Sequence, residues 1–566
     1  MNSTPRIPVP RPLHRCARRL NAAFQRQSPG GNAATMTARR LTLSAAYIAC
    51  ALLTACGTPP TGSATTPSGT RLTDVIATTG GPIQGLHAAL EDEYLGIPYA
   101  APPVGKLRWR PPQAPLRLQS TLRTTHFAPT CAQAPRGAFA SPSEAEDCLY
   151  LNVFVPRDAA TGHVTLRPVM LWIHGGGLFS GESNDYDASA LVRAGTIVVT
   201  VNYRIGALGF LSQPALNAEG HAYANYGLMD QQAALHWVQA NIAAFGGDSH
   251  KVTIFGQSGG ATSVLAQLAS PAAAGLFQRA IVQSGTRIAP YTQHEALAAG
   301  EAFAAAAGCP DQSAQCLRAL DVQQILRHQT AIAAYIGTRF PVVDGTIVTR
   351  TAQQAFERGE FNRVPVVNGL VADEQAFFMP EIMTGAPPLG ADGYERFLQT
   401  FGATRSASLH AAYPLASYAS PSEAEIAATQ DLKICTARYL DRNWANYVPV
   451  YAYQFEDRDA PSYFGPVSYP MRAYHTAELQ YLFPRFHGGA GTAHPLDAAQ
   501  QALAQRMVAD WTRFATSGAP PATWPRYSAA SDSIERLDTR APAVTAAYGI
   551  GHHCDLWEPV VLGAAH

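Results

Sequence analysis

The chain has 566 residues, of which 47% are hydrophobic, so it is long enough to bury a large core. It carries 41 basic and 41 acidic residues, and charged residues make up only 14% of the total. With no basic stripe or acidic tail, this composition excludes a partner held by bulk charge, nucleic acid above all. The length suits either two or three domains or one large α/β sheet with insertions.

The N-terminus predicts export rather than a folded domain. Residues 1–35 show no helical or strand period and are the expected leader, and Met36 is a second candidate start of translation. Residues 36–56 resemble a secretory signal, with paired arginines, an apolar run too short to span a bilayer, and small residues at the end. The residues around the paired arginines fit a twin-arginine export signal poorly. The last four residues resemble a bacterial lipobox and make Cys56 the expected lipidation site.

Ordinary cleavage near Ala55, which would release a free soluble protein, is the alternative to lipidation. Residues 57–70 have the composition of a flexible tether. The expected location is the periplasm, the outer membrane as a lipoprotein, or the extracellular space. Contact with a membrane is expected only through the lipid.

The cysteines support export. Cys16 and Cys50 lie in the segment that would be removed and Cys56 would carry lipid, which leaves an even set of six. Such a set in an oxidising compartment is typical of disulfides, although six cysteines allow 15 connectivities. Close spacing favours the pairs Cys131–Cys148 and Cys309–Cys316. The two cysteines that remain would then form the pair Cys435–Cys554. Neither close pair has the second Cys or His pair of a zinc finger, so no metal is expected.

Strand and helix patterns alternate through the rest of the chain. Continuous apolar runs at 169–173 and 196–201 are typical of strands buried on both faces. Residues 225–245 have apolar side chains on one helical face and end at a pair of glycines. The pattern continues with a strand at 252–255, a helix at 261–268, and strands at 364–367 and 450–455. This alternation predicts an α/β fold.

The pentapeptide Gly256-Gln257-Ser258-Gly259-Gly260 joins the predicted strand at 252–255 to the helix that follows. It fits the pattern Gly-X-Ser-X-Gly, in which side chains two positions from the serine would collide with the backbone of a tight turn. The turn would raise the serine hydroxyl above the sheet at a helix N-terminus, where developing negative charge is favoured. Ser258 is therefore the predicted nucleophile.

A second glycine-rich segment, His174-Gly175-Gly176-Gly177, follows the predicted strand at 169–173. Its glycines would let backbone N–H groups approach a substrate without side chains in the way. The expected donors to a tetrahedral oxyanion are the N–H groups of Gly176, Gly177 and Gly259. The Leu178-Phe179 pair that follows suggests an apolar pocket wall.

Three further segments match the signatures of a known family. They are Gly96–Trp109 (Gly-Ile-Pro-Tyr-Ala, Pro-Pro-Val-Gly, Leu-Arg-Trp), Glu146–Val153 (Glu-Asp-Cys-Leu-Tyr-Leu-Asn-Val) and Gly275–Gly285 (Gly-Leu-Phe, Arg-Ala-Ile, Gln-Ser-Gly). With these, the chain resembles the type-B carboxylesterase/lipase family, which includes the cholinesterases, over roughly residues 71–559. The resemblance implies an α/β-hydrolase fold, with a large, mainly parallel sheet flanked by helices and with helical insertions around an active-site gorge. It makes residues 71–566 a single catalytic domain.

The resemblance also implies the two partners of the serine. The family's acid lies in a Gly-X-X-X-Asp-Glu-Gly motif, which here ends in Asp373-Glu374-Gln375. Glu374 is the implied acid, Asp373 is the alternative, and Gln375 replaces the usual glycine. The family's His-X-X-Glu motif matches the segment that begins at His475, the implied base. The order serine, acid, histidine fits this fold, and the family's three disulfides agree with the pairing above.

The expected activity is hydrolysis of carboxylic esters through an acyl-enzyme, with no cofactor. A neutral acyl or aryl ester, small or polymeric, is the expected substrate. The 131–148 loop has no Trp and only Phe139 as an aromatic residue, and Gln257 stands where the family often has a glutamate that favours cations. A lipase or polyester hydrolase, or an acyltransferase, could use the same triad. A binding module without catalysis is disfavoured because all three residues are present, and the oligomeric state is left open.

Overall fold

The structure is a computed structural model that describes residues 71–135, 140–157 and 166–563. Residues from Gly69 to His566 form one compact unit. The expected leader, signal segment, Cys56 and tether lie outside the described residues, so export and lipidation stay predictions. Among the helices that the structure describes, none is long and apolar enough to cross a membrane.

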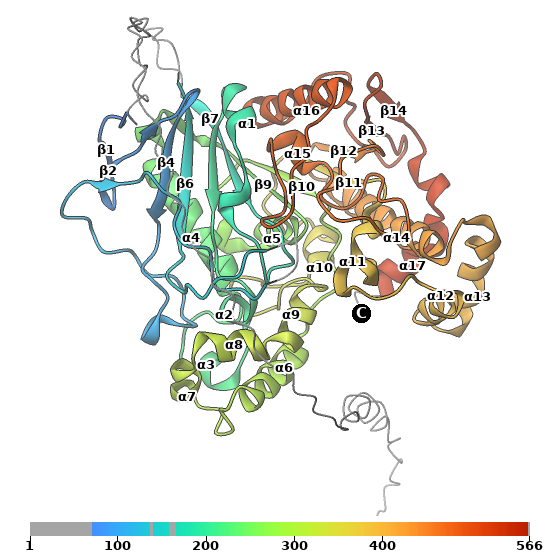
Figure 1. Ribbon diagram of the computed structural model, residues 1–566, viewed down its shortest axis with the longest axis horizontal. Coiled ribbons are helices and arrows are strands. Elements are labelled where there is room, and N and C mark those ends of the chain that lie inside the picture. The colour runs from blue at the N-terminus through green and yellow to red at the C-terminus, as the bar shows by residue number, and fades with distance from the viewer. Residues whose placement is uncertain (1–70, 136–139, 158–165, 564–566) are drawn as a thin grey trace, which may run out of the picture. The chain divides into compact units, whose positions relative to one another are not determined.

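An 11-stranded sheet runs through the unit (Figure 1) in the order β14-β13-β12-β11-β10-β9-β7-β8-β6-β4-β3. The strands from β8 to β13 in that order pair in parallel, and the strands at both edges pair antiparallel. The bounds in the large sheet are β3 Leu86–His87, β4 Glu91–Pro98, β6 Tyr150–Pro156, β7 Arg167–Ile173, β8 Ile197–Val201, β9 Gly247–Gln257, β10 Arg279–Gln283, β11 Val366–Val371, β12 Val450–Phe455, β13 Ile534–Leu537 and β14 Ala543–Thr545. A small sheet contains β1 Ile76–Thr78, β2 Gly81–Gln84 and β5 Leu122–Arg123.

Helices cover both faces of the large sheet. On one face α4, α5 and α14 contact the central strands, and on the other α1 and α16 do so. The helices are α1 Ser189–Arg193, α2 Gly206–Phe210, α3 Pro214–Asn217, α4 Tyr226–Asn241, α5 Gly259–Ala269, α6 Gln293–Ala306, α7 Ala314–Ala319, α8 Val322–His328, α9 Thr330–Ile336, α10 Ala352–Glu357, α11 Pro380–Thr384, α12 Ala391–Gln399, α13 Ala403–Ala412, α14 Pro421–Ala445, α15 Leu479–Leu482, α16 Ala498–Ser517 and α17 Cys554–Gly563.

Strand β7 shows why its sequence is continuously apolar. Val169, Leu171 and Ile173 pack into the core under α4 and α5, whereas Met170 and Trp172 pack into the core under α1 and α16. Because successive side chains of a strand point to opposite faces, a strand covered on both sides needs apolar residues at every position. The predicted doubly covered sheet is therefore confirmed at this strand.

Helix α4 differs from the single apolar face expected of it. Twelve of its 16 residues are buried, including Asp230, Gln231 and Gln232. Asp230 accepts hydrogen bonds from the Arg204 guanidinium at 2.8 Å, and the two glutamine side chains bond to residues of α5 and the segment after it. Buried polar partners, which the spacing of apolar residues does not reveal, explain the difference.

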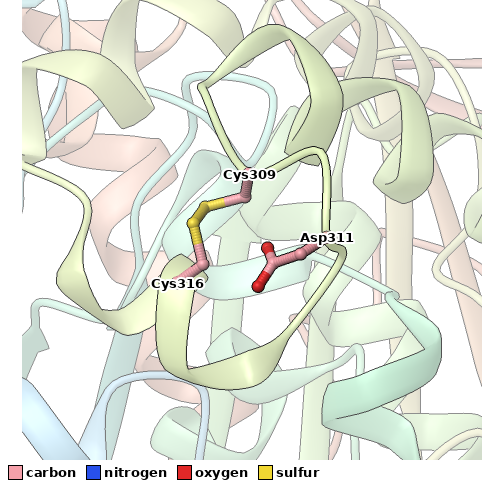
Figure 2. A group of neighbouring side chains, drawn as sticks. All are labelled: Cys309, Asp311 and Cys316. Atoms are coloured by element: carbon pink, nitrogen blue, oxygen red, sulfur yellow. A yellow bond between two sulfur atoms is a disulfide. The ribbon is translucent and has the colours of Figure 1, made fainter.

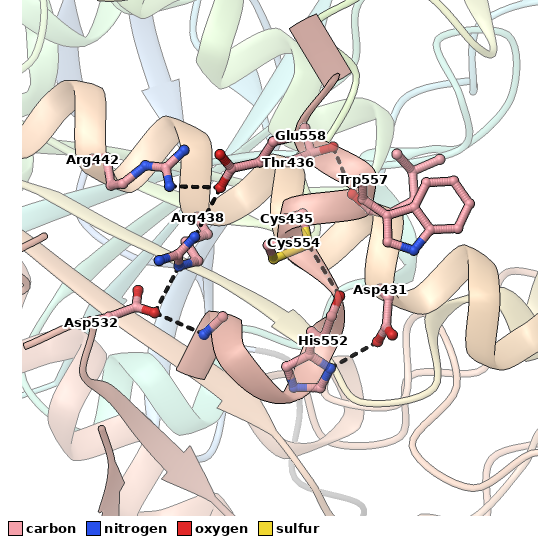
Figure 3. The surroundings of a disulfide bond; sticks show 12 residues. Asp431, Cys435, Thr436, Arg438, Arg442, Asp532, His552, Cys554, Trp557 and Glu558 are labelled. Atoms are coloured by element: carbon pink, nitrogen blue, oxygen red, sulfur yellow. Dashed lines mark hydrogen bonds and ion pairs between the residues drawn. A yellow bond between two sulfur atoms is a disulfide. The ribbon is translucent and has the colours of Figure 1, made fainter. Parts of the chain in front are cut away.

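The six cysteines are joined as Cys131–Cys148, Cys309–Cys316 and Cys435–Cys554, the pairing that close spacing favoured. The third disulfide ties α14 to the start of α17 (Figure 3), beside ion pairs from two arginines of α14. Arg438 contacts Asp532 at 2.7 Å and Glu558 at 2.9 Å, and Arg442 contacts Glu558 at 2.6 Å. The C-terminal segment is thus fixed to α14 by both covalent and ionic contacts.

Candidate active site

Ser258 occupies the turn between β9 and α5 in a strained backbone conformation. Its φ is +57° and its ψ is −120°, a region that costs a residue other than glycine about 1–3 kcal/mol. A Cβ on Gly256 would lie 2.7 Å from the carbonyl oxygen of Ile173, and one on Gly260 only 2.0 Å from the same atom. The glycines on either side are therefore needed for the close approach of the turn to the end of β7.

A backbone bridge brings the predicted acid and base together. Asp373 lies two residues after the end of β11. It pairs in parallel with Tyr474, and its N–H donates to the Ala473 carbonyl at 2.9 Å. The next residue on each segment is Glu374 on one side and His475 on the other. Nδ1 of His475 forms a short hydrogen bond with Oε2 of Glu374, and both residues are buried.

Asp373, the alternative acid, faces away from the imidazole. Its carboxylate lies 3.2 Å from the Arg458 guanidinium and 4.0 Å from that of Arg472, and it accepts the Ala473 N–H at 3.3 Å. Two adjacent carboxylates thus have different partners. Only the one on Glu374 contacts His475.

Ser258 and His475 line the same cavity, which has a volume of about 400 Å³. Nε2 of the Gln257 side chain lies 3.3 Å from Nε2 and 3.5 Å from Nδ1 of His475, so the residue before the serine contacts the imidazole. Within the described part of the chain, no hydrogen bond of the Ser258 hydroxyl itself is formed. Ser258 and His475 thus share the cavity wall without a hydrogen bond between their side chains in this structure.

The glycine-rich segment after β7 also lines this cavity. Gly176 and Gly177 both have positive φ, and a Cβ on Gly259 would lie 2.7 Å from the Gly177 nitrogen and 2.9 Å from the Leu178 nitrogen. Gly259 opens α5, so its N–H has no acceptor within the helix. The amides of Gly177, Leu178 and Gly259 are thus neighbours next to Ser258, and Leu178 is a member of this group that the sequence analysis did not name as a donor.

The rest of the cavity wall combines aromatic side chains with small residues and a few charged ones. Aromatic side chains come from five separate segments: Phe179, Tyr186, Phe377 with Phe378, Tyr463 and Phe486. The charged residues on the wall are Glu182, Asp185 and Arg287. Burial, together with the Glu182 carboxylate, raises the pKa of Asp185 to about 8, so this carboxyl carries a proton at neutral pH.

Burial and charge act on the Glu374–His475 pair in opposite ways. Burial alone would raise the pKa of Glu374, but the charge and hydrogen bond of His475, with the Lys433 ammonium, lower it overall. Burial lowers the pKa of His475 against the opposing effect of Glu374. The pair therefore favours an ionised carboxylate next to a neutral imidazole near pH 7.

Two residues of α14 that support this pair were missed from the sequence. The Gln430 side chain accepts the Glu374 N–H at 2.7 Å and donates to the Val371 carbonyl at 2.9 Å. The Lys433 ammonium donates to the Gln375 side chain at 3.2 Å. Both lie more than 50 residues along the chain from the acid, and no motif marks them.

One group of potential metal ligands occurs among the described residues, namely Cys309, Asp311 and Cys316 (Figure 2). The two sulfurs are bonded to each other, so neither is a thiolate ligand. Asp311 accepts a hydrogen bond from the Ser313 hydroxyl at 2.7 Å. The disulfide accounts for this cluster without a metal.

Comparison with known proteins identifies the family. Residues 73–557 match the Carboxylesterase family. The chain belongs to this family. It is 33% identical over 477 residues to the fumonisin B1 esterase of Sphingopyxis macrogoltabida, covering 80% of this chain and 84% of that relative. It is 33% identical over 476 residues to the para-nitrobenzyl esterase of Bacillus subtilis strain 168, covering 80% of this chain and 92% of that relative.

The solved structures agree with this assignment. A PNB esterase structure superposes with a TM-score of 0.72 at 29% sequence identity, covering 85% of this chain and 99% of the other. The mouse acylcarnitine hydrolase is a further relative, at 32% identity over 479 residues, 78% of this chain and 82% of its own. The predicted family and α/β-hydrolase fold are confirmed, and the protein is a carboxylesterase.

The close approach at Gly259 gives a test of the amide cluster. In the variant Gly259→Ala the added methyl would push away the Gly177 and Leu178 amides. We expect kcat for p-nitrophenyl acetate to fall about 100-fold, with an unchanged circular dichroism spectrum. Gly390→Ala is the control, because nothing lies within 4 Å of its added methyl and its φ is −90°. Equal losses in the two variants would contradict the assignment.

Proposed function

We propose that Ser258, His475 and Glu374 form a catalytic triad that hydrolyses carboxylic esters through an acyl-enzyme. The observation that carries the proposal is the hydrogen bond between Nδ1 of His475 and Glu374, in the wall of a cavity that Ser258 also lines. This bond fixes the tautomer in which Nε2 carries the lone pair that can accept a proton, and the Gln257 amide lies 3.3 Å from this atom. A serine hydroxyl is a weak nucleophile at neutral pH, so such a base is what its attack on an ester needs.

The reaction then runs in two halves. Nε2 of His475 takes the proton of Ser258 as its oxygen attacks the ester carbonyl, and the imidazolium next protonates the leaving alkoxide. Water repeats these steps on the acyl-enzyme and releases the acid. The carboxylate of Glu374 stabilises the imidazolium without itself gaining a proton.

The oxyanion of both tetrahedral intermediates is assigned to the N–H groups of Gly176, Gly177 and Gly259. Preorganised donors of this kind commonly contribute about 3 kcal/mol each to lowering the barrier. The positive φ of Gly176 and Gly177 and the free first N–H of α5 support this assignment.

The nucleophile is tested by Ser258→Ala. We expect at least about a 10⁴-fold loss of p-nitrophenyl butyrate hydrolysis, because no other hydroxyl is activated by His475. A fluorophosphonate probe should label the wild-type protein on the peptide that contains Ser258 and leave the variant unlabelled. Ser263→Ala, a buried serine on the same helix, is the matched control and should keep both activity and labelling. Normal turnover by Ser258→Ala would refute the mechanism.

The identity of the acid is tested by a pair of neutral substitutions on adjacent residues. Glu374→Gln should lower kcat by about 10³-fold or more, because the imidazolium loses its counter-charge and its tautomer. Asp373→Asn should cost less than about tenfold, because its ion pairs with Arg458 and Arg472 lie away from the imidazole. The reverse ranking of the two variants would make Asp373 the acid.

For the substrate, we propose a neutral acyl or aryl ester. Three features support this choice: the aromatic wall, the uncharged Gln257 beside His475, and a carboxyl at Asp185 that is protonated at neutral pH. Polymeric esters remain within this class, because the chemistry at the carbonyl is the same. The disulfides support export as well, since they persist in oxidising compartments.

Charge selectivity can be measured with a matched pair of esters. Against a choline ester, the neutral 3,3-dimethylbutyl ester of the same acid should have a kcat/KM about tenfold higher, because a quaternary ammonium would lose its hydration in a cavity where Arg287 offsets the charge of Glu182. Gln257→Glu should narrow this ratio by adding a negative charge at the cavity wall. A wild-type preference for the choline ester would contradict the proposed substrate class.

A further inference from the structure

Helix α14 meets the segment that carries the predicted acid at two points one turn apart. Gln430 holds the backbone of this segment at Val371 and Glu374. Lys433 reaches the same segment with its ammonium, which lies 3.2 Å from Oε1 of Gln375 and 4.3 Å from the centre of the Phe378 ring. The helix therefore supplies one neutral contact and one positive charge to the acid segment.

The Phe378 ring contacts both this charge and the imidazole. The centre of this ring lies 4.7 Å from the centre of the His475 ring and 4.3 Å from the ammonium nitrogen of Lys433. A cation on an aromatic face is held by the ring quadrupole, and Lys433 is half-buried, so its field is less screened than that of a fully exposed charge. The ammonium thus acts on the Glu374–His475 pair without touching it.

The residue that anchors the ammonium departs from the family motif. Gln375 occupies the position where the motif has glycine, and glycine has no side chain to accept the Lys433 hydrogen bond. The lysine is unusual too, because the chain has only three, Lys106, Lys251 and Lys433, against 38 arginines. The two residues together form a feature of this chain rather than of the motif.

We propose that Lys433, held by Gln375 against Phe378, is a positioning residue that keeps His475 neutral and Glu374 ionised in mildly acidic solution. The inference rests on the proposed triad. Burial lowers the pKa of Lys433 to about 8, against the opposing effect of Glu374, so the ammonium is charged at neutral and acidic pH. Its field disfavours the imidazolium of free His475.

Other charged groups also face these residues. Arg287, from the segment after β10, acts on His475 in the same direction as Lys433. Glu478, on the turn that follows His475, has its pKa raised to about 8 by burial and is neutral below that pH. Glu425, on α14, has its pKa raised by burial, and the Gln375 side chain opposes this with a hydrogen bond. Unlike Arg287, Lys433 does not line the cavity, so it can be substituted without changing the cavity wall.

The direction in which the pH profile should move follows from the protonation state of His475 in the enzyme without substrate. Esterase activity needs neutral His475, so kcat/KM falls as pH drops through the pKa of this histidine. Removing the ammonium favours the imidazolium and raises that pKa. Activity is then lost at a higher pH than in the wild type.

The test is the pH profile of kcat/KM for p-nitrophenyl butyrate between pH 5 and 9. Relative to its own value at pH 7.5, Lys433→Met should retain about threefold less activity at pH 5.5 than the wild type, with KM at pH 7.5 unchanged. Gln375→Gly, which restores the motif residue, should shift the profile in the same direction by less. Lys433→Arg should restore most of the wild-type profile.

Lys251→Met is the matched control, since Lys251 pairs with Asp248 on the surface at 3.3 Å and should leave the profile unchanged. Superimposable profiles of Lys433→Met and the wild type would overturn the inference, as would an equal shift in Lys433→Arg. Fluorophosphonate labelling of Ser258 and thermal unfolding are measured on every variant. If the wild type is not labelled, the proposed triad fails; if it is labelled and the Lys433→Met profile does not move, only this inference fails.

Discussion

The hydrogen bond between His475 and Glu374 connects two segments that lie 101 residues apart in the chain. It exists because the backbones of Asp373 and Tyr474 are paired, which brings the next residue of each segment alongside the other. The pairing extends the carboxyl end of the sheet, where β11 and the neighbouring strands end. In open α/β sheets ligands bind at this end, so the geometry of the sheet determines where His475 and Ser258 line one cavity.

The surroundings of this bond divide into two kinds. On one side lie the aromatic residues of the cavity, which exclude water and provide little fixed charge. On the other side lies α14, whose Gln430 and Lys433 side chains contact the segment of the acid. A carboxylate buried without partners would take up a proton, and the charge and hydrogen bond of His475, with the Lys433 ammonium, oppose this, whereas Gln430 holds the backbone. The cavity and the helix therefore serve the same pair in complementary ways.

Local patterns in the sequence were sufficient for much of the fold. The run at 169–173 and the turn around Ser258 could be predicted because their constraints, two covered faces and a crowded turn, act on consecutive residues. The acid and base needed the resemblance to a family, since nothing in the spacing of 17 histidines marks His475. Lys433, Gln430 and Asp185 could not be found, because their roles arise from packing between distant segments. The burial of Asp230 within α4 was missed for the same reason.

The disulfide between Cys435 and Cys554 has a bearing on how the protein can be made. The helix that it fastens to the C-terminal segment is the same α14 that contacts the acid. Cysteines 119 residues apart close a long loop, and a covalent link of that kind restricts the unfolded chain strongly. Synthesis in a reducing cytoplasm would therefore yield a chain with an intact serine turn but a less securely held α14, and oxidative maturation would be needed before its esterase activity represents that of the native protein.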